Sequence, residues 1–269
     1  MPDQWIVRKG LNMNVQRFFS RDLDSPIQLT AGEGRLHVWL FSLEDYEIFK
    51  KDAYCLSEDE RTRADRYARE SDRKRYITGH IALRRLLGFY LHSDPETFTF
   101  QVGAHGKPDL LYPAPDVRLS EQTPHHAPIH FNISHSADLV ALAFCFDSPV
   151  GIDIESIKDS AYIERIIRRF FHPSEYAFFS RLEDKQKKKV FFRSWTAREA
   201  FLKALGTGFS VSPDSFCIEP VETETFPDSG LYQVTKSRED YTPWRIQSVP
   251  APADYMCSVA YLPFESQTP

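Results

Sequence analysis

The sequence predicts an α+β protein made of two similar lobes. Two observations support this fold class. In each half of the 269-residue chain, helical patterns are followed by strand patterns. The short connector Asp147-Ser148-Pro149 separates two apolar, strand-like segments, so we expect lobes at residues 1–147 and 148–269. Each lobe is long enough to bury a core of its own.

The first half shows an ordered series of patterns after a polar, irregular stretch at 1–34. Residues 35–41 alternate between two faces and predict a strand. Ser57-Glu58-Asp59-Glu60 has capping-box spacing and predicts a helix to about residue 69. Ser71 or Asp72 is expected to cap a longer helix that ends near Leu91. Strands are expected at 98–102, 129–134 and 139–146, with a proline-rich loop at 112–128.

The second half begins with a strand at 150–155. Helices are expected at 160–170, 173–182 and 186–205, and Gly206 and Gly208 are natural helix stops. Four further strands are expected near 214–219, 231–235, 244–249 and 255–262.

Composition limits the classes of protein. A hydrophobic content of 42% with 21 phenylalanines is typical of a globular protein. A net charge of -5 argues against nucleic acid as a partner, because such binding usually needs a basic surface. Apolar runs are too short to span a membrane, and no secretion signal is evident. The four cysteines are scattered, which fits neither a disulfide framework nor a zinc site, so we expect a cytoplasmic protein. We also expect a monomer.

Two segments of the second half place charged groups at chemically useful spacing. Asp153 and Glu155 alternate with apolar residues and therefore share one face of the strand. Glu199 and Lys203 are i and i+4 neighbours on a predicted helix, one turn after Trp195, which we interpret as core. Three carboxylates and a lysine could hold Mg²⁺ against a phosphate ester.

Two segments of the first half are suited to anions. Phe131-Asn132-Ile133-Ser134-His135-Ser136 ends a strand with amide, hydroxyl and imidazole donors. His105-Gly106-Lys107-Pro108 offers a turn that carries a lysine. Taken singly, each motif also has a structural interpretation. Lys107 could be an ordinary turn lysine, His135 a core histidine, and Asp153 with Glu155 a solvated strand face. The histidines at 125, 126 and 130 lack ligand spacing, so we reject a metal site there.

Taken together and in order, four segments resemble the surfactin-type (Sfp-type) 4′-phosphopantetheinyl transferases. They are Gly106–Pro108, Phe131–Ser136, Val150–Glu155 and Trp195–Lys203, and the resemblance covers about residues 57–262. It implies two pseudo-symmetric α+β lobes in one chain, with coenzyme A bound at the lobe interface. It also implies transfer of phosphopantetheine from coenzyme A to a serine of an apo acyl or peptidyl carrier protein, releasing adenosine 3′,5′-bisphosphate.

The resemblance assigns roles residue by residue. Mg²⁺ would be held by Asp153, Glu155 and Glu199, with Glu199 as the base and Lys203 stabilising the leaving phosphate. Which carboxylate is ligand and which is base stays open. Coenzyme A would contact a larger set: Arg63, Arg75, Gly106, Lys107, Pro108, Asn132, Ser134 and His135. Two departures are Arg198, where lysine is commonest, and Glu60, where some relatives have a basic residue. Arg84 and Arg85 are expected to be structural ion-pair partners.

Two rival functions and two docking surfaces are left open. A Mg²⁺-dependent phosphodiesterase or nuclease could use the same carboxylates, and a silent relative could bind coenzyme A as a scaffold. For the carrier protein we favour residues 165–171, which mix arginines with apolar side chains, over the lysine run 185–189. The competing interpretation is that the apolar members of 165–171 are all core.

Overall fold

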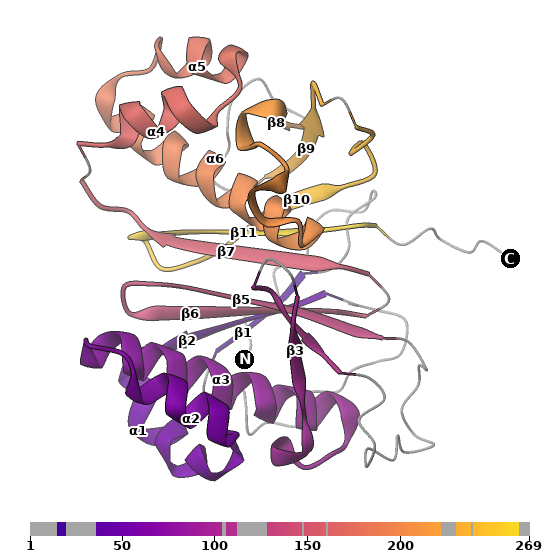
Figure 1. The fold of residues 1–269 in the computed structure, drawn as a ribbon. Helices are drawn as coiled ribbons and strands as arrows, with labels where there is room; N and C mark the ends of the chain where they lie inside the picture. Colours follow the sequence, from indigo (N-terminus) through magenta and orange to yellow (C-terminus); the bar gives the residue numbers. More distant parts are fainter. Residues whose placement is uncertain are drawn as a thin grey trace, which may run out of the picture. The chain divides into compact units, whose positions relative to one another are not determined.

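The computed structural model describes residues 15–19, 36–103, 106–111, 128–146, 148–159, 161–221, 230–237 and 239–263. The chain divides into two compact units, one of Met1–Gly103 with Pro108–Asp147 and one of Ala104–Lys107 with Ser148–Pro269. The short segment Ala104–Lys107 therefore belongs with the second unit rather than with the lobe 1–147 expected from the sequence. Mixed helices and sheets in each unit confirm the α+β class (Figure 1).

The first unit is built on a sheet with the order β1-β2-β6-β5. Its strands are β1 (Val15–Phe19), β2 (Leu36–Ser42), β5 (Ile129–Ser136) and β6 (Leu139–Phe146). β1 runs parallel to β2, and the other pairs are antiparallel. A separate hairpin joins β3 (Phe100–Val102) and β4 (Pro108–Leu110). β5 is thus an edge strand of its sheet, and it carries the Asn-Ile-Ser-His segment.

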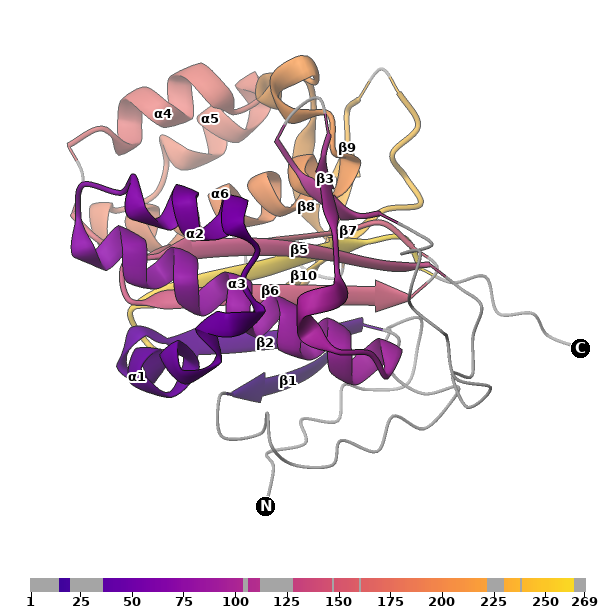
Figure 2. The same cartoon turned by 60° about the horizontal axis from the view of Figure 1, so that its bottom comes forward.

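One long helix covers this sheet. Ahead of α3 (Glu70–Leu91) lie α1 (Tyr46–Phe49) and α2 (Glu58–Asp65), with 3-10 turns at Leu43–Asp45 and Lys50–Cys55. A further 3-10 turn, Pro95–Thr97, follows α3. Figure 2 shows α3 crossing the sheet, where it contacts β6. Ile81, Leu86 and Leu87 of α3 are buried with Val140, Leu142 and Phe144 of β6. Burial of these apolar side chains holds the helix to the sheet.

The second unit has a five-stranded antiparallel sheet with the order β7-β11-β10-β9-β8. The strands are β7 (Val150–Ser156), β8 (Cys217–Pro220), β9 (Leu231–Thr235), β10 (Arg245–Val249) and β11 (Tyr255–Tyr261). The helices are α4 (Ile163–Phe170), α5 (Pro173–Phe179) and α6 (Asp184–Leu205), with 3-10 turns at Gly208–Ser210 and Pro213–Ser215. α6 lies along β7 and β11 (Figure 1).

A glycine sets how closely α6 approaches β7. A Cβ atom on Gly151 would overlap the backbone carbonyl oxygen of Ala200 and the amide nitrogen of Ala204, and would lie 2.9 Å from the Cα of Ala204. Real Cβ atoms do not approach backbone atoms this closely, so any larger residue must push the helix away. We call this backbone contact of Gly151 with Ala200 and Ala204 the α6–β7 contact. Glycine inside a strand often marks such an approach.

Most predicted elements are confirmed, with β6 and β9 at the expected bounds. The predicted cap of α3 is wrong: the helix begins at Glu70, and Arg69 precedes it without a side-chain cap. Acidic Glu70 and Asp72 in the first turn favour this start through the helix dipole. β1, β4 and α1 were not predicted. Most of the proline-rich loop at 112–128 lies outside the described residues.

The predicted structural role of the two neighbouring arginines of α3 is confirmed. Arg84 Nε lies 2.8 Å from Glu60 Oε2, and its guanidinium also donates to the carbonyls of Pro95 and Phe98. Arg85 pairs with Asp52 at 3.0 Å. Glu60 completes the predicted capping box with Ser57. The acidic residue at position 60 is therefore explained by a buried ion pair with Arg84, which is only 2% exposed.

Candidate active site

The strand β7 presents two carboxylates on the face that meets α6. Asp153 pairs in register with Ser258 of β11, and Glu155 with Met256. Because side chains alternate along a strand, both carboxylates share the side of Gly151. Asp153 is only 5% exposed, whereas Glu155 is half-buried. Ile152 and Ile154 are fully buried. The apolar pair anchors the strand and leaves the acidic face toward the helix.

The helix α6 brings a lysine directly to the buried aspartate. Lys203 Nζ donates to Asp153 Oδ1 at 2.6 Å. Lys203 is one residue from Ala204, and Asp153 is two residues from Gly151, so this ion pair is formed beside the α6–β7 contact. A lysine and a carboxylate 50 positions apart in the sequence therefore meet because two backbones touch.

Glu199 lies one helical turn before Lys203, and the other two carboxylates shift its pKa. Burial, then the negative charge of Asp153, raises the pKa of Glu199 to about 6, and Glu155 adds to the effect. Lys203 and Arg198 act in the opposite direction. The three predicted carboxylates thus share one electrostatic environment, in which their mutual repulsion is only partly offset by the two cations.

The chemistry of these donors fits a small divalent cation. Mg²⁺ prefers hard oxygen ligands and is usually held by one or two carboxylates together with substrate phosphates and waters. Asp153 lies close enough to Glu199 for its negative charge to raise the pKa of Glu199. Within the described ranges, however, no three acidic, histidine or cysteine side chains are arranged to hold a metal by themselves. The ligand set Asp153, Glu155 and Glu199 therefore stays a prediction.

Arg198, which stands where lysine is commonest among the relatives, is fully buried. Its guanidinium donates to Glu175 Oε2 of α5 and to the carbonyls of Pro213 and Phe216. It also lies 4.3 Å from the ring centroid of Phe171. These contacts fix the middle of α6 and hence Glu199, the next residue. A bidentate-capable guanidinium suits this buried network better than an ammonium does.

The turn Gly106-Lys107-Pro108 places its lysine on backbone carbonyls. Lys107 Nζ donates to Val150 O and to Lys203 O, each at 3.0 Å. Gly106 has φ +85° and is exposed, a backbone conformation that glycine adopts without strain. Pro108 begins β4 of the first unit. The lysine predicted to face a phosphate therefore contacts both elements of the α6–β7 contact.

In the first unit, three of the predicted coenzyme A residues gather at one end of α3. Gly79 of α3 packs against Val140 of β6, and Val140 pairs in register with His135 of β5. Near the other end of α3, the ring centroid of Tyr90 lies 5.0 Å from that of Phe144 in β6. The start of α3 thus points toward His135. Arg75 belongs to this start of α3 and pairs with Asp72.

Arg63 reaches the same end of α3. Its guanidinium lies 5.7 Å from the ring centroid of Tyr76. His80, not singled out from the sequence, stacks on Tyr76 with ring centroids 3.8 Å apart. Burial raises the pKa of Tyr76 to about 12 and lowers that of His80, so both are neutral near pH 7. His80 therefore adds no positive charge at this end of α3 near pH 7.

The remaining predicted coenzyme A residues of the first unit face elsewhere. Asn132 and Ser134 are 4% and 6% exposed and alternate with Ile133, which packs on α3 through Gly79. They therefore lie on the sheet face opposite to His135. The structure places Arg63 and Arg75 at the start of α3 and His135 opposite Val140 in the sheet. In the second unit it brings Lys107, Asp153, Glu155, Glu199 and Lys203 together.

The predicted docking segment 165–171 is divided between core and surface. Ile167 and Phe171 are buried, so for these two the core interpretation is correct. The other apolar members, Ile166 and Phe170, line a hollow of about 310 Å³ with Arg165 and Arg169. In the lysine run, Lys187 pairs with Glu164 at 3.8 Å and Lys188 with Asp159 at 2.7 Å. A basic, partly apolar surface thus remains on α4.

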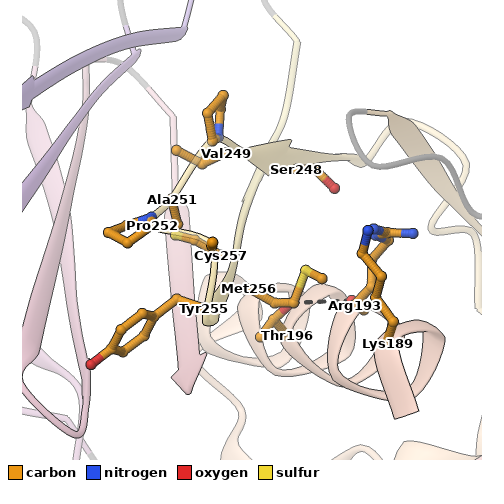
Figure 3. Close-up of a pocket in the computed structure, with 12 residues that line it drawn as sticks. Lys189, Arg193, Thr196, Ser248, Val249, Ala251, Pro252, Tyr255, Met256 and Cys257 are labelled. Atoms are coloured by element: carbon orange, nitrogen blue, oxygen red, sulfur yellow. Dashed lines mark hydrogen bonds between the residues drawn. The ribbon is translucent and has the colours of Figure 1, made fainter. Parts of the chain in front are cut away.

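A second hollow, of about 230 Å³, lies between α6 and the β10–β11 connection (Figure 3). Lys189, Arg193 and Thr196 of α6 face residues 248–253 and 255–257 across it. None of the predicted site residues lines it. Cavity volume alone therefore does not locate the site, and the site around Gly151 stays a prediction.

Family models and known relatives match this chain. The family described as the 4′-phosphopantetheinyl transferase superfamily matches residues 149–260, and the family described as 4′-phosphopantetheinyl transferase, N-terminal, matches residues 41–146. The chain is 36% identical over 217 residues to the 4′-phosphopantetheinyl transferase HetI of Nostoc sp., covering 79% of this chain and 87% of that protein. It is 30% identical to 4′-phosphopantetheinyl transferase Sfp of Bacillus subtilis, over 61% of this chain and 66% of the relative. In the part of the chain that is described, no helix is long and apolar enough to cross a membrane.

The raised pKa of Glu199 predicts a pH-dependent cost to folding. The folded protein holds this proton more tightly than the unfolded chain, so the cost is absent below about pH 4.5 and complete above about pH 6. In the presence of chelator at pH 7.5, Glu199→Gln should raise the free energy of unfolding by about 1–2 kcal/mol, and the gain should vanish near pH 4. Urea denaturation at several pH values measures this.

Glu219→Gln is a matched control in the same unit. Glu219 pairs on the surface with Lys236, and its loss should change stability by only a few tenths of a kcal/mol. A Glu199→Gln variant that is less stable than the parent at pH 7.5, or whose gain does not depend on pH, would contradict the electrostatic interpretation.

Proposed function

We propose that this chain, which belongs to the 4′-phosphopantetheinyl transferase family, transfers the 4′-phosphopantetheine arm of coenzyme A to a serine of an apo acyl or peptidyl carrier protein. The reaction uses Mg²⁺ and releases adenosine 3′,5′-bisphosphate. Transfer of phosphopantetheine to carrier proteins is the activity of this enzyme family. The observation that carries the finer proposal is the Lys203–Asp153 ion pair beside Glu199.

The reaction needs positive charge at the reacting phosphorus. The serine oxygen must attack a pyrophosphate phosphorus that is surrounded by negative oxygens, and negative charge passes to the leaving phosphate. Groups placed where this charge develops lower the barrier more than groups that only bind substrate. Three carboxylates alone would repel coenzyme A. A divalent metal ion and Lys203 together would cancel that negative charge.

The residues of the second unit divide this work. Asp153, Glu155 and Glu199 would hold Mg²⁺, which when bound neutralises and orients the pyrophosphate. Glu199 would accept the serine proton, directly or through a water. Its burial favours this role, because a carboxylate with a raised pKa is a stronger base that is still ionised at neutral pH. Lys203 would donate to the leaving phosphate.

Recognition of coenzyme A is proposed for residues that do not react. Arg63, Arg75 and His135 offer two guanidinium groups and an imidazole at one end of α3. Guanidinium groups bind phosphate oxygens with paired hydrogen bonds, so this end of α3 suits the 3′-phosphate. Roles in coenzyme A binding for Asn132, Ser134, Gly106 and Pro108 stay predictions, as do the cytoplasmic location and the monomeric state.

Carrier-protein docking is proposed for the outer side of α4. Arg165 and Arg169 flank the half-buried Ile166 and Phe170. Carrier proteins are generally acidic near the modified serine, so arginines would orient the partner and the apolar side chains would add affinity. The lysine run is less suited, because Lys187 and Lys188 are already paired with acidic residues.

Loss of the proposed metal ligands should abolish transfer without unfolding the protein. The test incubates the chain with coenzyme A, Mg²⁺ and a panel of apo carrier proteins, and follows the phosphopantetheine mass increment. Asp153→Ala and Glu199→Ala should each lower the rate on the order of 10³-fold. Glu155→Ala should cost less, since a water can replace its oxygen. Glu219→Ala, a surface control in the same unit, should behave like the parent.

Near-normal turnover of either variant, together with indifference to excess chelator, would rule out the metal assignment. Cleavage of coenzyme A with water as the acceptor would instead support a phosphodiesterase. Binding of coenzyme A or carrier without any mass increment, for every carrier in the panel, would support a catalytically silent scaffold.

Arg63 should contribute to binding rather than to chemistry. Arg63→Ala is expected to raise the KM for coenzyme A about tenfold with little change in kcat, because the 3′-phosphate does not react. Dephospho-coenzyme A, which lacks that phosphate, should show no difference between Arg63→Ala and the parent. Arg66→Ala removes an exposed arginine from the end of the same helix and serves as the control. A penalty that persists with dephospho-coenzyme A would show that Arg63 does not bind the 3′-phosphate.

A further inference from the structure

Lys107 bridges the strand and the helix that carry the proposed catalytic groups. Its ammonium donates to the carbonyl of Val150, the first residue of β7, and to the carbonyl of Lys203 in the last turn of α6. Both distances are 3.0 Å. The lysine is separated from these partners by 43 and 96 positions in the sequence. A single side chain thus joins two elements at their point of closest approach.

The last turn of α6 needs such a donor. The final four carbonyls of a helix have no partner within the helix. Gly206, with φ +68°, closes the helix by donating to Leu202 O. The next carbonyl, that of Lys203, receives the ammonium of Lys107. A positive charge at a helix C-terminus is also favoured by the helix dipole. Lys107 therefore acts as a helix cap supplied from a distant segment.

The other end of the bridge lies next to Gly151. Val150 precedes the glycine whose missing side chain allows α6 to touch β7. Lys107 therefore ties both sides of the α6–β7 contact. The capped carbonyl belongs to Lys203 itself, whose side chain reaches Asp153. Movement of this last turn would displace the Lys203 ammonium from Asp153.

We propose that Lys107 is a positioning residue, which holds the last turn of α6 on β7 so that Lys203 and Asp153 stay aligned for phosphoryl transfer. This inference rests on the proposed function. It differs from the role in coenzyme A binding that the sequence predicts for this lysine. A phosphate ligand governs substrate affinity, whereas a residue that aligns the catalytic groups governs kcat, because small displacements of reacting groups are costly.

The test compares Lys107→Met with the parent in the full-length protein. Methionine keeps much of the side-chain length and removes every donor. We expect kcat for transfer to a carrier protein to fall about 10- to 100-fold. The dissociation constant of coenzyme A, measured by calorimetry without carrier, should change less than about threefold. Amide hydrogen exchange at residues 202–206 should accelerate at least about tenfold, because the uncapped turn opens more often.

Val234→Ala is the matched control. Val234 is buried in β9 of the same unit, and its truncation creates a cavity that destabilises the fold. We expect it to leave kcat within about twofold of the parent, which separates lost alignment from lost stability.

A coenzyme A dissociation constant that rises tenfold or more would overturn the proposal in favour of a phosphate contact. Unchanged kcat or unchanged exchange in the last turn of α6 would overturn it as well. The exchange measurement needs no turnover, so it distinguishes failure of this inference from failure of the proposed function.

Discussion

The backbone contact between α6 and β7 at Gly151 is the constraint on which the site depends. Asp153 and Glu155 belong to the strand, whereas Glu199 and Lys203 belong to the helix. Neither pair can form a phosphate site alone. They meet because the missing side chain of Gly151 lets β7 approach Ala200 and Ala204 of α6 to contact distance. The Lys203–Asp153 ion pair at 2.6 Å is the direct consequence.

Other contacts stabilise the same arrangement from several sides. Arg198 fixes the middle of α6 through Glu175 and through the carbonyls of Pro213 and Phe216. Lys107 caps its last turn and holds the start of β7. Thr196 and Ser258 form a buried hydrogen bond of 3.0 Å between α6 and β11. A partly buried cluster of like charges is costly, and this framework keeps Glu199 near Asp153 despite their repulsion.

Local spacing in the sequence predicts which charged residues lie together on the strand and on the helix. It does not predict that the strand pair and the helix pair contact each other. Alternation along a strand placed Asp153 with Glu155, and the i, i+4 rule placed Glu199 with Lys203. The distance between strand and helix depends on tertiary packing, for which the sequence offers only one signal, a glycine inside an apolar strand. Lys107 was predicted to contact a phosphate, yet it donates to carbonyls up to 96 positions away. Arg198 was missed for the same reason, since its partners Glu175, Pro213 and Phe216 are scattered along the chain. In the first unit, β1 lies in a polar segment without a strand pattern, so only pairing with β2 reveals it.

The most direct test of this account is the Gly151→Ala variant, studied by unfolding and by phosphopantetheine transfer. An added methyl group must push α6 away from β7, so the free energy of unfolding should fall by about 3 kcal/mol or more. At a temperature where the variant is still folded, the transfer rate should fall on the order of 100-fold, because the helix and strand groups are no longer aligned. A folded Gly151→Ala protein with the stability and transfer rate of the parent would contradict the claim that this contact builds the site.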